Sequence, residues 1–467
     1  MAPITWEPCE SDFIYMDDRP TGHVRYRSQW RRWFGPMPGR REAHAMATVA
    51  LVIGAILCAV AVILGFQGRT FLGRPLGGDF VEFYTIGKIL NNYAPARIYD
   101  LGLAVSLQHS TLPSMPDTQM LVFGQAPFIA SLFRPLALLP YAWAYVAWLV
   151  FSAGLYIAGL ALLFRTVRLN AEDRKTGFLL ALSSTPFLFE TWIGGQMSVV
   201  VFFIWVLFFW CLEDDRRVVA GLGAGFVLAL CLFKPTLVAL PVLMLVIGRR
   251  WRVLGGFAAG AAAMAWLSIA TVGADGCRAW FAALAMNGNR VGQSGEAWHL
   301  AKYVDILAFS HLLFANWPEL ADLAAIAVAI VAVSWLGLAW WRSDGLAPDR
   351  SLWAATLCCT LVVNPYAPIY DAILLVAAVA LVASHRQGLA AWILLLYLLP
   401  WITQSFAEFL HLQLMTAALA GFGMWALEKA GNSSVSHFKP RREESTMTGP
   451  LQPRATGRFQ VRSRGLP

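Results

Sequence analysis

The sequence predicts an all-α integral membrane protein, a polytopic bundle of helices with loops and short interfacial helices on its outer face. The first reason is composition, because 58% of the 467 residues are hydrophobic and only 14% are charged, with a mean hydropathy of +0.57. A soluble chain of this length could not bury so much apolar surface. The second reason is that the apolar residues fall in runs of roughly 15–22, about the length with which a helix crosses a bilayer. The third is the recurrence of short basic clusters between these runs.

The apolar runs predict about twelve spanning helices, several of them short enough to need tilting or burial within the protein. In chain order they cover residues 45–66, 142–164, 177–190, 196–212, 218–234, 236–248, 253–273, 320–340, 352–364, 369–384, 389–402 and 406–426. The stretch 127–140 is apolar as well, but it holds Arg134, Pro135 and Pro140, and counting it as a span would break the alternation of charged loops. We expect it to form a re-entrant or interfacial helix.

Basic residues assign the cytoplasmic side of this bundle. Lysine and arginine are enriched in the cytoplasmic loops of membrane proteins. Here the basic residues cluster within residues 31–41, 165–175, 216–217, 249–252, 342–350 and 385–386, and in the tail from Lys439. Both termini then lie in the cytoplasm and the number of spans is even. Residues 1–44 are expected to be a largely disordered cytoplasmic flank, 45–426 the membrane domain, and 427–467 a basic, disordered tail.

Other features of the chain exclude several kinds of site. The first apolar run begins too far into the chain for a cleaved signal peptide. The seven cysteines are odd in number and lie mostly in apolar runs, so no disulfide framework is expected. No Cys/His spacing typical of a metal site is present, and the inner loops lack the Asp-x-Asp motif that a nucleotide-sugar donor usually requires. No metal ligand is assigned, no cofactor is firmly implied, assistance by a divalent cation is left open, and nucleic acid is not expected as a partner.

The polar residues that could take part in catalysis or binding are predicted to lie on the outer side. Asp79 and Glu82 follow the first apolar run, at a lipid–water boundary where carboxylates are poorly placed for packing but well placed to take a proton from a hydroxyl. Lys234 ends an apolar run immediately before Pro235. An unpaired ammonium in hydrocarbon costs about 2.5–3.5 kcal/mol, so Lys234 should face a phosphate, a carboxylate or the interface.

Four sequence blocks, spread over residues 78 to 385, resemble glycosyltransferase family 87, whose members are polyprenyl-phosphate-sugar-dependent enzymes of the GT-C superfamily. The blocks are Asp79-Phe80 with Tyr99-Asp100; Ala126-Pro127-Phe128 leading to Arg134-Pro135 and Pro140; Gly195-Gln196 with Phe233-Lys234-Pro235 and Arg250-Trp251-Arg252; and Asn364-Pro365-Tyr366 with Tyr370-Asp371. Their order and spacing carry the resemblance. The chain departs from it at Gln125-Ala126-Pro127, where relatives usually have Tyr-Pro-Pro, and in the segment 302–311, which lacks the expected arginine.

The resemblance implies a GT-C-type bundle and an inverting glycosyltransferase. Such an enzyme moves a sugar, here mannose or another hexose or pentose, from a polyprenyl-phosphate donor to a lipid or cell-envelope glycan acceptor. It would act on the periplasmic face of a bacterial inner membrane. The reaction needs a base for the acceptor proton and donors or cations that hold the departing phosphate. The resemblance implies Asp79 as the base.

The remaining candidate residues are assigned by chemistry and position. Lys234 and Arg290 are expected to bind the donor phosphate, because cations suit phosphate oxygens. The sugar or the acceptor is expected to contact residues with carboxylate, amide, phenol or indole groups: Glu82, Glu190, Gln196, Trp298, Asn364, Tyr370 and Asp371. His299 and His311 are weaker alternatives for the base, and Trp192 is a second candidate for stacking on a sugar.

Each assignment competes with an ordinary structural role. Asp79 and Asp371 could be helix N-caps, and Gln196 could simply begin a helix. Glu82 could lie on a solvated helix face, Lys234 could snorkel to the interface, and Arg290 could be a surface residue in a long loop. Two other classes of function also remain. A transporter or flippase for a lipid-linked saccharide would place its ionisable groups at mid-membrane depth, and a non-catalytic binding subunit would agree with the departure at Gln125-Ala126.

Overall fold

The computed structural model describes residues 39–67, 76–113, 121, 123–213, 218–293, 300–343 and 350–436. Over these residues the protein is all-helical, apart from one isolated β-bridge between Tyr303 and Pro368, so the all-α prediction is confirmed. Most of the two predicted flanks lies outside the described residues. The helical part is longer than 45–426, because α2 already begins at Arg40 and α19 continues to Ser436.

The helices follow one another along the chain, with short 3-10 or π-helical pieces labelled η. They are α2 (Arg40–Phe66), α3 (Phe80–Asn92), η1 (Pro95–Tyr99), α4 (Leu101–Thr111), α5 (Pro127–Ala130), η3 (Ser131–Phe133), η4 (Leu136–Leu138), α6 (Tyr141–Thr166), α7 (Ala171–Leu182), η5 (Pro186–Ile193), α8 (Ser198–Leu212), α9 (Val218–Ala229), η6 (Leu230–Phe233), η7 (Pro235–Leu237), α10 (Ala239–Ile247), α11 (Trp251–Gln293), α13 (Ile306–Leu313), α14 (Pro318–Arg342), α15 (Arg350–Val363), η8 (Ile369–Ile373), α16 (Leu374–Leu381), α17 (Arg386–Leu398), η9 (Leu399–Trp401), α18 (Thr403–Leu410) and α19 (Leu414–Ser436).

Four of the described helices are long and apolar enough to cross a membrane, namely α2, α6, α14 and the part Trp251–Ala285 of α11. Two bent pairs qualify together: η5 with α8, bent by 120°, and Gly388–Trp401 with α18, bent by 59°. Other apolar helices are shorter. The 14 residues of α15 rise about 21 Å, less than a hydrocarbon core of about 30 Å. The described residues thus contain four candidate spans, or up to six, and do not confirm the predicted count of about twelve.

Two predicted spans are broken where the backbone departs from the α-helical conformation. The run 177–190 starts in α7, but the chain then changes to the π-helix η5 at Pro186, whose nitrogen cannot donate to a helix ladder. That π-helix ends at Gly194. The run 406–426 is divided as well, since α18 ends at Leu410 and His411 takes a left-handed φ of 53°. In both places one apolar run holds two helices.

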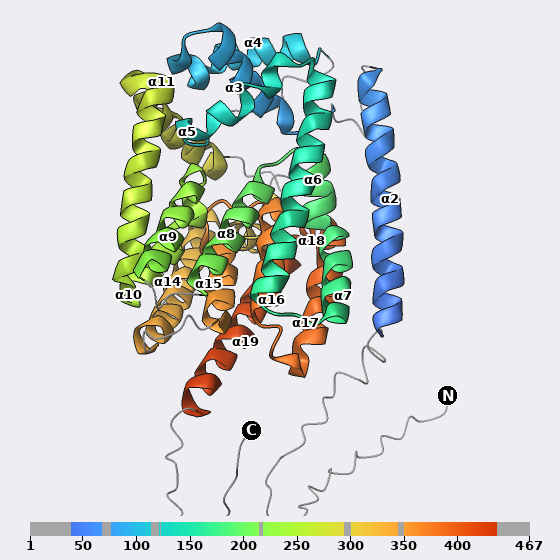
Figure 1. The fold of residues 1–467 in the computed structure, drawn as a ribbon, viewed down its shortest axis with the longest axis vertical. Coiled ribbons are helices and arrows are strands. Elements are labelled where there is room, and N and C mark those ends of the chain that lie inside the picture. Colours follow the sequence, from blue (N-terminus) through green and yellow to red (C-terminus); the bar gives the residue numbers. More distant parts are fainter. Residues whose placement is uncertain are drawn as a thin grey trace, which may run out of the picture.

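Basic residues at the described starts and ends of several helices gather at one end of the molecule. Arg350 at the start of α15 donates to the carbonyl of Thr166 at the end of α6 (3.0 Å) and to Glu213 at the end of α8. The Arg249 guanidinium lies 4.0 Å from the ring centroid of Trp341 at the end of α14. The start of α2 and the end of α19 lie at this same end, the lower one in Figure 1. We refer to it as the basic end.

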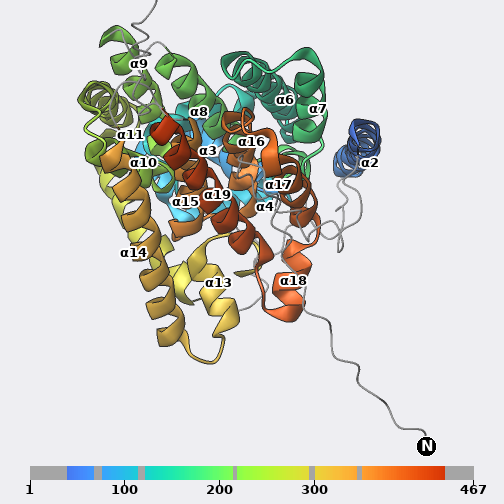
Figure 2. The same cartoon turned by 90° about the horizontal axis from the view of Figure 1, so that it is seen from below.

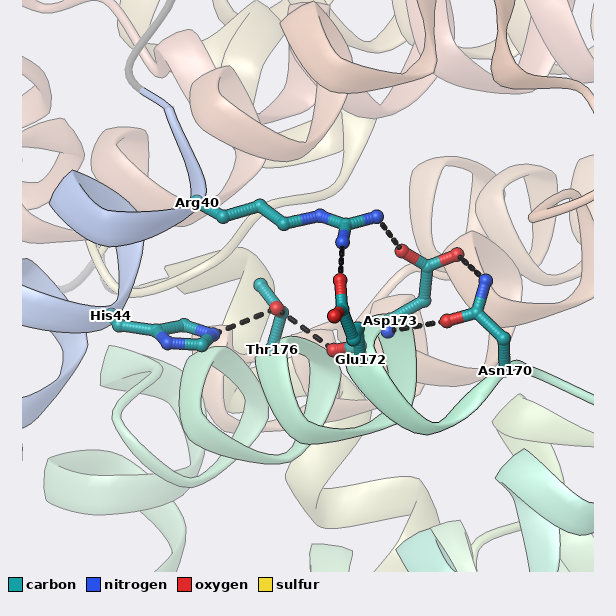
Figure 3. A network of polar contacts seen from close by, with 6 residues as sticks. All are labelled: Arg40, His44, Asn170, Glu172, Asp173 and Thr176. Carbon is teal, nitrogen blue, oxygen red and sulfur yellow. Dashed lines mark hydrogen bonds and ion pairs between the residues drawn. The ribbon is translucent and has the colours of Figure 1, made fainter.

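Helix α2 stands at the margin of the bundle, beside α7 (Figure 2). A polar network at the basic end connects the two helices (Figure 3). Arg40 of α2 donates to both Glu172 and Asp173 of α7, and the His44 ring lies 2.8 Å from the hydroxyl of Thr176. These contacts fix the lower end of α2, whereas most of its length presents apolar side chains outward.

Short helices cover the opposite end of the bundle, the upper one in Figure 1, where α3, α4 and α5 lie. The predicted interfacial stretch 127–140 forms α5, η3 and η4 rather than one helix. It packs closely on α3, because Phe83 and Phe133 stack with ring centroids 4.9 Å apart and the Tyr84 hydroxyl donates to the carbonyl of Leu139 (2.8 Å). This layer carries Asp79 and Glu82 to the top of the bundle.

Asp305 is a buried carboxyl group that connects the start of α13 to the loop after α15. Its carboxylate caps α13 through the amide of Ala308 (2.8 Å) and accepts the amide of Ala367 (3.0 Å), and burial raises its pKa to about 6. Because the folded state then holds this proton more tightly than the unfolded state, its contribution to stability falls as pH rises from about 4 to about 6.

We expect wild-type protein to lose about 1 kcal/mol more stability than Asp305→Asn between pH 5 and pH 7.5, since one pKa unit corresponds to about 1.4 kcal/mol. Thermal unfolding of the purified protein across this range measures the two slopes. The difference between the two slopes reports on Asp305 alone. Titration of the other groups affects both proteins equally, and the hydrogen bond lost in the asparagine variant shifts its stability by the same amount at every pH. Parallel slopes would show that Asp305 does not titrate in this range.

Candidate active site

Two glycine turns from distant parts of the chain meet above α8 and bring the first two site residues together. Gly77, Gly78 and Gly195 have positive φ angles of 85°, 50° and 70°. A Cβ atom on Gly195 would lie 2.5 Å from the carbonyl oxygen of Gly77, and one on Gly78 would lie 2.9 Å from that of Gly194. The amide of Asp79 donates to this Gly194 oxygen (3.0 Å). Only glycine permits both this approach and these backbone angles.

Helix α6 holds both turns through two tyrosines, four residues apart on one face. The Tyr141 hydroxyl donates to the carbonyl of Leu76 (2.6 Å), next to the first turn, and the Tyr145 hydroxyl donates to that of Ile193 (2.7 Å), next to the second. The ring of Phe80 packs on both, at centroid distances of 5.8 and 5.7 Å. The backbone around the site is therefore fixed by buried aromatic contacts.

Gly195→Ala tests this arrangement. We expect a loss of more than about 2 kcal/mol in stability, because the left-handed conformation alone costs roughly 1–2 kcal/mol for a residue with a Cβ and the added atom would also clash with Gly77. The matched control is Gly154→Ala in α6, where a Cβ would meet nothing within 4 Å and helix propensity favours alanine by about 0.5–1 kcal/mol. Thermal unfolding of both variants gives the comparison; equal stability would mean that the turns relax freely.

The meeting of the turns pairs Asp79 with Gln196. The amide nitrogen of Gln196 donates to the Asp79 carboxylate, and the Gln196 side chain is buried. Asp79 stands at the N-cap position of α3, but its φ and ψ are helical and its side chain makes no cap hydrogen bond. The capping interpretation of Asp79 is therefore wrong. A carboxylate that accepts from an amide donor is favoured in its ionised form.

Glu82 lies one turn further along α3 and is buried, with 8% of its surface exposed. The alternative of a solvated helix face is therefore wrong. Its Oε1 atom has no hydrogen-bond partner among the described residues. Burial raises the pKa of Glu82 well above its usual range, the Asp79 carboxylate raises it further, and the Lys234 ammonium lowers it in part. Asp79 and Lys234 are thus both close enough to Glu82 for their charges to affect its pKa.

Lys234 is held between helices by a carboxylate. Its ammonium lies 2.7 Å from Oδ1 of Asp371 and 3.3 Å from the Ser198 hydroxyl, which itself donates to Asp371 (2.6 Å). It also lies 4.6 Å from the ring centroid of Tyr370. Only 11% of the Lys234 side chain and 3% of the Asp371 side chain are exposed, so Lys234 does not snorkel. Asp371 is not an N-cap either, because Pro368 holds that position for η8.

The turn after α15 adds a further polar residue beside Lys234. Asn364 is buried; its amide nitrogen donates to the Thr236 hydroxyl (3.3 Å), two residues after Lys234, and its oxygen accepts the amide of Tyr366 (3.0 Å). The carbonyl of Tyr370 accepts the hydroxyl of Thr191 (3.3 Å), which connects this turn to the segment preceding Gln196. These segments form one polar cluster: Asp79 pairs with Gln196, Lys234 pairs with Asp371 and Ser198, and the charges of Asp79 and Lys234 both act on Glu82. Asn364 and Tyr370 lie on the segment that carries Asp371.

Other predicted site residues do not join the cluster through the described contacts. Glu190 accepts a hydrogen bond from Gln404 of α18 (3.0 Å). The Trp192 indole donates to the carbonyl of Leu149 in α6 (2.9 Å), which is a structural contact. His311 pairs with Asp322 of α14 (2.8 Å).

The side chains of three predicted residues, Arg290, Trp298 and His299, lie outside the described part of the structure. The backbone of Arg290 belongs to the last turns of α11, but its side chain is outside the described part of the structure. Trp298 and His299 lie wholly outside the described residues.

Ser198 is a member of the cluster that the sequence did not reveal. It is fully buried at the start of α8 and hydrogen-bonds both Asp371 and Lys234. Its position two residues after Gln196, at the same helix start, was the only signal. Among the described residues, no group of three His, Cys, Asp or Glu side chains is placed to hold a metal ion.

The cluster combines the two functions that transfer to a hydroxyl requires. One carboxylate, Asp79, is held by an amide and half-buried, so it can accept a proton. One ammonium, Lys234, is oriented by Asp371 and Ser198 and can interact with an anion. The residues come from four separate chain segments, around residues 79, 196–198, 234 and 371, which meet only in the folded state.

Fold and site together define a helical membrane protein with a buried acid–base cluster among its helices. The chain belongs to glycosyltransferase family 87: the model of that family matches residues 125–365, just over half of the chain. The protein is therefore a glycosyltransferase. The matched range includes Gln196, Lys234 and Asn364, while Asp79 and Asp371 lie beyond its two ends. No curated protein and no solved structure matches the chain.

Proposed function

We propose that the protein is an inverting glycosyltransferase that uses a polyprenyl-phosphate sugar and acts on the periplasmic side of a bacterial inner membrane. The observation that carries the proposal is that Gln196 hydrogen-bonds the half-buried Asp79, and that the charges of Asp79 and Lys234 both act on the buried Glu82. The bundle is proposed to be of GT-C type, with the shorter apolar helices completing the membrane domain. The sugar is mannose or another hexose or pentose, and the acceptor is a lipid or cell-envelope glycan.

In the proposed reaction the acceptor oxygen attacks the anomeric carbon as the bond from that carbon to the phosphate oxygen breaks. The phosphate leaves with the bonding electron pair, and the acceptor hydroxyl gives its proton to the Asp79 carboxylate. Lys234 binds the phosphate as negative charge builds on it. A positioned base contributes about 10²–10⁴-fold to such a rate. Gln196 orients Asp79 through its hydrogen bond, and Asn364 and Tyr370 line the same cluster.

The direct test uses purified protein, a labelled polyprenyl-phosphate mannose and a membrane-lipid extract as acceptor. Transfer of label to a lipid product with inverted anomeric configuration supports the proposal. Donor binding without transfer by any of several polyprenyl-phosphate sugars would favour a binding subunit. Movement of intact donor across a vesicle bilayer without transfer would favour a flippase. Glycan profiling of a deletion strain identifies the missing product and hence the acceptor.

The periplasmic placement has its own test. The basic end carries the clustered arginines, which favours the cytoplasm for that end and the periplasm for the layer containing α3 and α4 (Figure 1). A cysteine replacing the exposed Ser106 of α4 should react with a membrane-impermeant maleimide in intact cells, and one replacing the exposed Lys175 of α7 should react only after permeabilisation. The unsubstituted protein gives the background from its native cysteines. The reverse labelling pattern would invert the proposed topology.

A further inference from the structure

Within the part of the chain that the structure describes, Glu82 is the carboxylate of the cluster that has a buried oxygen without a hydrogen-bond donor. Asp371 has Lys234 and Ser198, and Asp79 has Gln196. The Oε1 atom of Glu82 is buried and has no partner among the described residues. A buried polar atom without a partner costs free energy, and a buried charge without one costs far more. The neutral acid is therefore the favourable form at this position.

The charge of the cluster leads to the same conclusion. If all side chains were ionised, three carboxylates (Asp79, Glu82 and Asp371) would share the cluster with one ammonium, that of Lys234. A lipid phosphate would then have to bind a cluster with two excess negative charges. Placing a proton on Glu82 removes one of these charges and turns a repelling group into an O–H donor. Burial and the neighbouring Asp79 both raise the pKa of Glu82, while Lys234 is the opposing influence.

We infer that Glu82 is a protonated carboxylic acid in the resting enzyme and donates its O–H to an oxygen of the donor's phosphate, together with Lys234. Asp79 and Glu82 thus have different roles on neighbouring turns of one helix. Asp79 is ionised and accepts the acceptor proton, whereas Glu82 keeps its proton and binds the leaving group. The identity of the phosphate rests on the proposed function; the protonation state of Glu82 does not. Different environments commonly divide roles in this way between two carboxyl groups in one site.

The protonation state is tested by infrared spectroscopy of the purified, substrate-free protein at pH 7. Wild-type protein is expected to show a carboxylic-acid carbonyl band that is absent in Glu82→Gln and unchanged in Asp275→Asn, an exposed carboxylate on α11. A spectrum in which wild type and Glu82→Gln do not differ in this band overturns the inference. Because the measurement needs no substrate, its result is independent of the enzyme's activity.

The phosphate contact is tested by binding of sugar-free polyprenyl phosphate to wild type and two variants. Glu82→Gln retains a neutral donor, so its affinity should stay within about threefold of wild type, whereas Glu82→Leu should bind at least about tenfold more weakly. Thermal unfolding confirms that both variants are folded. If Glu82 is instead ionised, Glu82→Gln should bind more tightly than wild type, which overturns the inference. A folded Glu82→Leu variant with wild-type affinity also overturns it. If the band is present but wild type binds no polyprenyl phosphate, the donor class of the proposed function fails and only the protonation state survives.

Discussion

Asp79→Asn is expected to lower the rate of sugar transfer by about 10²–10⁴-fold while donor binding stays close to that of wild type. Asparagine has nearly the same shape and can still pair with the Gln196 amide, but it cannot accept a proton from the acceptor. The loss should therefore appear in kcat rather than in the affinity for the donor. A transfer assay with labelled donor, combined with a separate donor-binding measurement, distinguishes the two.

Asp275→Asn is the matched control for this variant. Asp275 lies on α11 with 81% of its side chain exposed and pairs only with the nearby Arg278 among the described contacts. It should transfer sugar at the wild-type rate. Full activity of Asp79→Asn would remove Asp79 from the mechanism, and a collapse of its thermal stability would make a structural role the better explanation.

The ion pair between Lys234 and Asp371 gives the second large effect. Removing one member of a buried pair leaves a charge without compensation, at a cost of about 3–5 kcal/mol. We therefore expect Asp371→Leu and Lys234→Met each to reduce stability strongly. The double variant should recover much of the loss, because replacing a buried pair by apolar side chains of similar size is often neutral. Chemical or thermal unfolding of the four proteins gives the coupling free energy.

Function should not recover together with stability in the double variant. Without Lys234 the cluster holds no ammonium, so binding of a polyprenyl phosphate should be lost even though the fold is restored. Recovery of both stability and binding would show that Lys234 serves the fold alone. A double variant as unstable as the single variants would mean that Ser198, left without its acceptor, matters more than the charge pair.

Residue chemistry was sufficient to predict several members of the site but not their partners. The cost of an unpaired ammonium in hydrocarbon predicted that Lys234 faces a phosphate, a carboxylate or the interface, and the structure supplies a carboxylate, that of Asp371. Nothing in the sequence connects these two residues, which are 137 positions apart. Asp79 was predicted as the base from its position after the first apolar run and from the family resemblance, and the structure shows that its side chain does not cap α3. Its pairing with Gln196 depends on two glycine turns that carry no hydropathy signal.

Burial was the least predictable property. The position of Glu82 on a short helix between apolar runs suggests a solvated residue, but in the structure its side chain is buried. The predicted count of about twelve spans is not confirmed, for a related reason. Backbone breaks at proline and glycine are tolerated inside a membrane protein when neighbouring helices and side chains satisfy the freed groups, so a hydropathy profile alone cannot separate one long span from two short helices.

The contact between the two glycine turns has an evolutionary consequence. The two turns fit together only because both are made of glycine, since a side chain on either one would clash with the backbone of the other. The sequences of the two loops therefore cannot change independently during evolution. A homologue that acquires a side chain at one turn should show an altered sequence at the other, and these positions should co-vary across the family more strongly than either does with its own flanking residues.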